Sequence, residues 1–157
     1  NKTTIKSYVN KAIFSESRSL VRDAGQALVY TANKQGAKVN QTIIKDIISK
    51  VSYVFDEDTH TYLHIVRDIL LNKGVSKEAR VKLEEWMNNL PYRIERCSIS
   101  EEIKDDIRYY ANQIAGIMTI IWPDWTGLNA WQTYIGKEHL KNDVRNGFEI
   151  GVSLANS

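Results

Sequence analysis

The residues from Ser100 to Tyr134 constrain the fold of this chain more than any other stretch. Apolar side chains recur at helical spacing through residues 101–121 and cover one wide stripe. In the second half of this segment, few side chains are left to face water: Asn112, Gln113 and Thr119. Because a helix that is apolar almost all round normally lies in a core, we expect residues 101–121 to form a central helix.

The other segments show amphipathic helical patterns. Apolar residues recur at intervals of three and four, and we find no convincing period-two alternation or hairpin signal. Ser76 is suited to cap a helix, and Pro91 is expected to end the helix that follows it. Ser98 with Glu101 has the spacing of a capping box for the next helix, and Ser100 is the alternative cap. Residues 128–135 and 138–152 are expected to form the last two helices. The sequence therefore predicts an all-α bundle of six to eight amphipathic helices packed around the central one.

Length and composition place the chain among ordinary globular proteins. Its 157 residues are 43% apolar and 25% charged, which fits one all-helical domain over residues 1–157. No apolar run approaches the roughly 20 residues that span a bilayer, and the first residues lack the apolar core of a secretory signal. A single cysteine, Cys97, excludes an intramolecular disulfide and favours a reducing compartment. We therefore expect a soluble, cytoplasmic protein that has no membrane partner.

Charge is unevenly distributed along the chain. Residues 1–50 carry nine basic and three acidic side chains, a balance of +6, whereas the remaining residues carry twelve basic and sixteen acidic ones, a balance of −4. Such a field can steer an acidic protein or a nucleic acid. Clustered cations suffice to contact phosphates, so the N-terminal segment supplies candidate nucleic-acid-binding residues. These are Lys6, Lys11, Arg18 and Arg22.

A cluster of aromatic residues follows the central helix. It contains three of the four tryptophans of the chain. Aromatic side chains dominate both protein cores and the hot spots of interfaces, so the cluster has two interpretations: core packing, or contact with a partner protein. The candidate partner-binding residues are Trp122, Trp125, Trp131 and Tyr134.

One face near the acidic turn at residues 56–58 carries potential metal ligands. On a helix, Glu57, His60 and His64 lie at positions i, i+3 and i+7, a spacing at which neighbouring side chains can share one Zn²⁺ or Fe²⁺ ion. His139 and Asp143 form a second pair at i, i+4. The alternative interpretation is that the acidic residues favour the positive end of a helix and that the histidines lie on the surface.

Motifs that would carry catalysis or bind a cofactor are missing from the sequence. It contains no G-x-S-x-G, no P-loop, no G-x-G-x-x-G and no H-E-x-x-H. We therefore predict no catalytic residue and no cofactor, with a zinc or iron site as the alternative.

The leading hypothesis is a non-enzymatic, regulatory module that binds another protein. A content rich in Ile, Lys and Asn is typical of phage, plasmid and AT-rich bacterial proteins, which suggests an inhibitor or immunity-type protein. Nucleic-acid binding is the second hypothesis.

Overall fold

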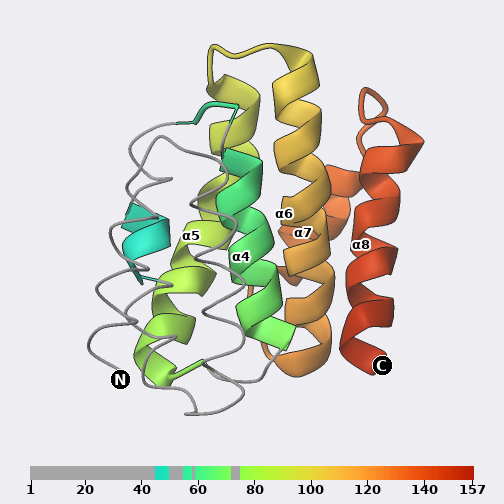
Figure 1. The fold of residues 1–157 in the computed structure, drawn as a ribbon. Helices are drawn as coiled ribbons and strands as arrows, with labels where there is room; N and C mark the ends of the chain where they lie inside the picture. The colour runs from blue at the N-terminus through green and yellow to red at the C-terminus, as the bar shows by residue number, and fades with distance from the viewer. Residues whose placement is uncertain (1–44, 50–54, 58, 72–74) are drawn as a thin grey trace. The chain divides into compact units, whose positions relative to one another are not determined.

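The computed structural model describes residues 45–49, 55–57, 59–71 and 75–157 (Figure 1). These residues form helices and turns, with no strand among them, so the all-α prediction is confirmed for this part of the chain. Besides the helical residues 45–49, the helices are α4 (Thr59–Leu71), α5 (Lys77–Arg96), α6 (Glu101–Ile121), α7 (Leu128–Ile135) and α8 (Asn142–Asn156). None of the helices in these ranges is long and apolar enough to cross a lipid bilayer.

The chain divides into two compact units, residues 1–83 and 84–157, with the boundary inside α5. The prediction of a single domain stays a prediction. In the first unit, α4 follows a turn in which the backbone N–H of Asp56 donates to Thr59 Oγ1 at 2.9 Å. One face of α4 is buried and apolar, as its helical period predicts: Tyr62, Leu63, Ile65, Val66, Ile69 and Leu70.

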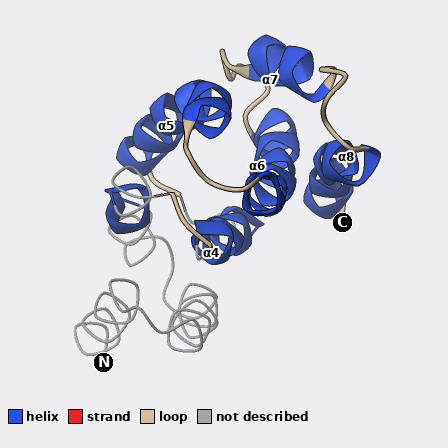
Figure 2. Cartoon of the chain, turned by 90° about the horizontal axis from the view of Figure 1, so that it is seen from above, coloured by secondary structure: helices blue, strands red, loops and turns tan. Residues whose placement is uncertain are grey.

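Helix α6 is the most deeply buried helix of the second unit. Ser100 caps it, because its side chain accepts a hydrogen bond from the backbone N–H of Ile103 at 3.2 Å. Every residue from Ala111 to Met118 is buried, so the prediction that Asn112 and Gln113 face water was wrong. Helix α6 packs against α8 and, over a smaller area, against α7, and Figures 1 and 2 show α8 beside it. The expected central helix is therefore present, while the packing of all the helices around it stays a prediction.

Three glycines bring the backbones of α6 and α8 together. A Cβ atom added at Gly116 would collide with the carbonyl oxygen of Phe148, and one added at Gly151 would collide with that of Gln113. At Gly147 an added Cβ would lie 2.6 Å from the carbonyl oxygen of Tyr109. The pairs Tyr109–Gly147 and Gln113–Gly151 advance together along both helices, so α6 and α8 run in the same direction. At these three positions only glycine leaves enough space for the two backbones to approach this closely.

Helix α5 continues through Pro91 to Arg96, so the prediction that Pro91 ends it was wrong. Proline has no N–H and cannot donate to the carbonyl four residues earlier, which here belongs to Met87. The indole Nε1–H of Trp131, on α7, donates to that Met87 carbonyl at 2.9 Å. A long-range side chain thus replaces the missing bond of the helix, and this contact cannot be seen in the local pattern around Pro91.

Helix α7 has the expected bounds and ends at Gly136, but α8 begins later than expected. Residues 138–140 form turns, and α8 starts at Asn142, with Lys141 as its N-cap. The backbone N–H of Leu140 donates to the carbonyl of Lys137 at 3.1 Å, which closes one of these turns. The turns lie between the end of α7 at Ile135 and the start of α8 at Asn142. His139 is therefore outside the helix.

The bond between Trp131 and the Met87 carbonyl can be tested with a double-mutant cycle. Trp131→Phe should lower the free energy of unfolding by about 1–3 kcal/mol, because it leaves a buried carbonyl without a donor. In a Pro91→Ala background residue 91 regains an N–H, so the same change should cost about 1 kcal/mol less. Urea denaturation of the four proteins measures the coupling. Additive effects, within about 0.5 kcal/mol, would contradict this role of Trp131.

Candidate functional site

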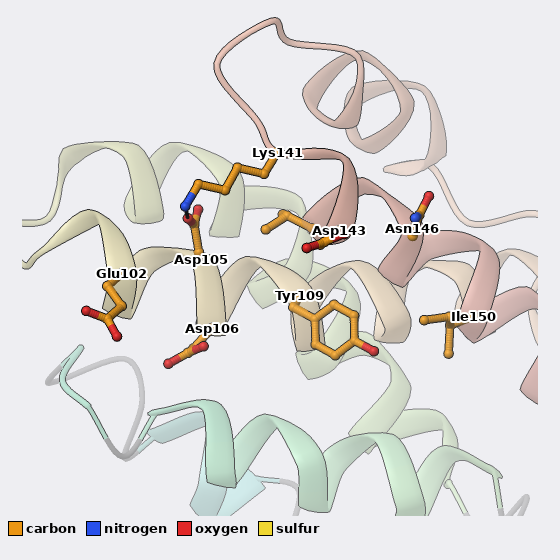
Figure 3. Close-up of a pocket in the computed structure, with 9 residues that line it drawn as sticks. Glu102, Asp105, Asp106, Tyr109, Lys141, Asp143, Asn146 and Ile150 are labelled. Atoms are coloured by element: carbon orange, nitrogen blue, oxygen red, sulfur yellow. Dashed lines mark ion pairs between the residues drawn. The ribbon is translucent and has the colours of Figure 1, made fainter.

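A groove of about 530 Å³ lies along the seam between α6 and α8, near the N-terminal ends of both helices (Figure 3). Because the two helices run in the same direction, the first turns of both contribute to one end of it. The residues of α6 that line the groove are Glu102, Asp105, Asp106 and Tyr109. The residues contributed by α8 and its N-cap are Lys141, Asp143, Val144, Asn146 and Ile150.

Negative charge dominates the lining of the groove. Four carboxylates face one ammonium group, and Lys141 Nζ pairs with Asp105 Oδ2 at 3.4 Å. Glu102, Asp106 and Asp143 are exposed and form no ion pair with any residue in the described ranges. The wall also has apolar surface, from the half-buried ring of Tyr109 and from Ile150, which is 37% exposed. The groove is therefore suited to a ligand that carries both positive charge and apolar surface.

Behind the groove, a buried arginine joins α5, α6 and α7. Arg108 is 1% exposed, and its guanidinium donates to Glu95 Oε1 at 3.0 Å, Glu101 Oε2 at 2.9 Å and Asp105 Oδ1 at 2.8 Å. Its Nε–H donates to the Tyr134 hydroxyl at 3.0 Å, and that hydroxyl donates to Glu95 Oε1 at 2.8 Å. A buried charge is tolerated only with such partners. Arg108 donates to one carboxylate oxygen of Asp105, and Lys141 pairs with the other. These two contacts hold the Asp105 carboxylate in one orientation in the wall of the groove.

The pKa values of this cluster follow from burial and hydrogen bonding. Burial alone would raise the pKa of Glu95, but hydrogen bonds from Tyr134, His139 and Arg108 outweigh it and hold that pKa below its ordinary value. Burial is likewise the main reason that the pKa of Tyr134 is raised. Burial would lower the pKa of Arg108, yet its hydrogen bonds to Glu101, Tyr134 and Asp105 raise it overall. Glu95 is thus an anion, and Tyr134 a neutral donor, near neutral pH.

Acid should weaken the second unit through Glu95. The pKa of this carboxyl is lower in the folded protein than its ordinary value of 4.5, so its contribution to stability is present above that pH. The contribution is lost as the pH falls through the folded pKa. We expect the urea midpoint to fall more steeply below pH 4.5 in the wild type than in Glu95→Gln. Glu138→Gln, at an exposed carboxylate outside the cluster, should keep the wild-type slope.

The aromatic residues proposed as partner contacts are mostly buried in the second unit. Trp131, Tyr134 and Trp125 are 0%, 2% and 4% exposed, and the Trp131 and Tyr134 rings meet edge to face with centroids 5.6 Å apart. Trp125 Nε1 donates to Asn88 Oδ1 at 2.9 Å. Trp122 is half-buried. Burial of three rings favours the packing interpretation of the cluster, and their contact with a partner stays a prediction.

The proposed metal ligands do not form a cluster in the described residues. No group of three or more His, Cys, Asp or Glu side chains in these ranges is arranged to hold a metal ion. Glu57 lies in a turn before α4, and His64 Nε2 pairs with Asp68 at 3.2 Å on the next turn of that helix. The Nε2 atom of His139 lies 3.2 Å from both carboxylate oxygens of Glu95. His60 is half-buried on α4, and Asp143 lines the groove.

The residues proposed for nucleic-acid binding, Lys6, Lys11, Arg18 and Arg22, lie outside the described residues, so that hypothesis is not tested. Sequence reasoning missed the groove and the buried Arg108. A signal for both was present in residues 101–108, where acidic side chains and Arg108 fall on adjacent turns of one helix. Acidic residues near a helix start are readily explained by the helix dipole, so the second role of these four residues was not recognised.

No protein-family model, curated protein or solved structure matches this chain.

Proposed function

We propose that this chain is a non-enzymatic module that binds another protein, and that the groove between α6 and α8 binds a basic segment of that protein. The observation that carries this proposal is the groove itself, in which Glu102, Asp106 and Asp143 surround an open space and have no ion-pair partner in the described ranges. Exposed carboxylates of this kind attract cationic side chains and set which partners are accepted.

The chemistry of the groove favours a peptide over other ligands. Nucleic-acid phosphates are repelled by clustered carboxylates, so the groove does not suit DNA or RNA. Lysine and arginine combine a charged head with an apolar stem, and this matches carboxylates placed beside Tyr109 and Ile150. A module that binds without performing chemistry acts by blocking or holding its partner, which is how a regulator or an inhibitor works.

Selection from a random peptide library tests the proposal with a defined probe. Twelve-residue peptides displayed on phage would be selected on the full immobilised chain. We expect enrichment of peptides rich in lysine and arginine, because only cations complement three unpaired carboxylates. Their affinity should fall as salt is raised from low to physiological concentration, since exposed charges are screened within about 10 Å.

A matched pair of charge reversals locates the binding surface. Asp106→Lys places an ammonium group in the groove, whereas Glu138→Lys makes the same change of net charge at an exposed position that does not line it. Selected peptides should lose at least about tenfold in affinity for Asp106→Lys and retain wild-type affinity for Glu138→Lys. Equal binding to both variants, or failure of basic peptides to be enriched, would rule out the groove as the binding site.

A further inference from the structure

A second hollow extends the groove along α8. It has a volume of about 320 Å³ and shares two lining residues, Asn146 and Ile150, with the first. Its other lining residues are Glu149, Ser153, Leu154 and Ser157. Ile150 and Leu154 are each 37% exposed and lie one turn apart on the same face of α8. The two hollows therefore form one continuous surface on the seam and on α8.

This surface has two chemically different ends. The acidic end consists of Glu102, Asp106 and Asp143. At the other end Ile150 and Leu154 supply apolar surface, beside the exposed carboxylate of Glu149. Figure 3 shows Glu102 and Asp106 on one side of Tyr109 and Ile150 on the other. At 1.5 Å per residue, α8 rises about 10 Å from Asp143 to Ile150 and about 16 Å from Asp143 to Leu154. An occupant must match this order and spacing.

From this surface we infer that the bound segment is an amphipathic α-helix of the partner protein. The inference rests on the proposed function and names the form of the partner. The helix carries a basic residue at one end and apolar residues seven and eleven positions away on the same face. Those spacings return to one face of a helix because 3.6 residues make a turn. The basic residue then meets the acidic end while the two apolar residues meet Ile150 and Leu154.

The hydrogen bonding of the groove walls favours a helical occupant over an extended one. An extended peptide needs backbone hydrogen bonds from its receptor, as at the edge of a sheet. Here the walls are α6 and α8, and beyond the first turn of each helix their backbone groups are bonded within the helix itself. A helix satisfies its own backbone, and its side-chain ridges fit the groove between two neighbouring helices. Recognition then depends on side chains alone.

Designed peptides test this inference directly. The probe is an alanine-rich, lactam-stapled 16-residue helix with two lysines one turn apart and leucines seven and eleven positions from the first. A second probe has the opposite order of charge and leucine, to cover both directions of binding. The control for each has the same composition, but its leucines are moved by two positions, which turns them to another face of the helix. Fluorescence anisotropy with the full chain should show about tenfold tighter binding of one probe than of its control.

Variants of the protein locate the apolar contact. Ile150→Ser with Leu154→Ser should weaken binding of that probe by about tenfold. Ile120→Ser is the matched control, because Ile120 is also 37% exposed but lines neither hollow. It should leave the affinity unchanged. Circular dichroism of each variant checks that its helical content is retained.

The binding results distinguish a failure of the helical inference from a failure of the proposed function on which it rests. If probe and control bind equally and both are lost with Asp106→Lys, the groove binds basic segments but does not require a helix, and the inference is overturned. If no basic peptide binds, the proposed function also fails. A dimer of the chain alone that Asp106→Lys dissociates would mean that a second copy occupies the groove, which also overturns the inference.

Discussion

Arg108→Met should lower the free energy of unfolding by about 3–5 kcal/mol, because it removes the cation shared by three carboxylates and leaves buried polar groups without a donor. Arg108 is almost fully buried, and its partners come from three helices of the second unit, through Glu95, Asp105 and Tyr134. Methionine fills similar space, so the loss reports on charge rather than on a cavity. Urea denaturation followed by tryptophan fluorescence measures it.

Two further variants distinguish this explanation from a general sensitivity of α6. Glu101→Gln removes a partner of Arg108 that is 70% exposed, and it should cost less than about 1 kcal/mol. Glu95→Gln combined with Arg108→Met should be less destabilising than the sum of the two single changes, because the carboxylate that Arg108 neutralised is then gone. Additive losses would show that Arg108 acts mainly by packing.

The helices could be predicted where a local pattern determines them. The apolar stripe of residues 101–121, the cap at Ser100 and the short helix that ends at Gly136 depend on residues within one or two turns of each other. The helical period and the capping residues also act over one or two turns. They were therefore sufficient to predict these helices.

Long-range contacts explain what could not be predicted. Pro91 is a helix breaker by every local rule, and the donor that accommodates it, Trp131, lies forty residues later in the chain. Arg108 looks like a surface residue in the sequence because its partners Glu95 and Tyr134 are brought to it only by folding. The groove likewise requires α6 and α8 to lie side by side in the same direction, which no helical period specifies.

The parallel crossing of α6 and α8 leads to a prediction in which two physical effects have opposite signs. In the interior of an exposed helix, Gly→Ala stabilises by about 0.5–1 kcal/mol because alanine loses less backbone entropy. At Gly151, however, the new methyl group would collide with the carbonyl oxygen of Gln113, which is part of the α6 backbone. Backbone cannot rotate away as a side chain can. We therefore expect Gly151→Ala to destabilise the protein by about 1–3 kcal/mol or more.

Gly136→Ala is the matched control for this crossing. An added Cβ at Gly136 would lie 3.5 Å from its nearest neighbours, an ordinary contact, and φ there is −81°. Its effect on the free energy of unfolding should therefore range from zero to a gain of about 1 kcal/mol. Thermal and urea denaturation of both variants gives the comparison. If Gly151→Ala were as stable as Gly136→Ala, the helices could separate without cost at this point. The seam that forms the groove would then not be held by backbone contact.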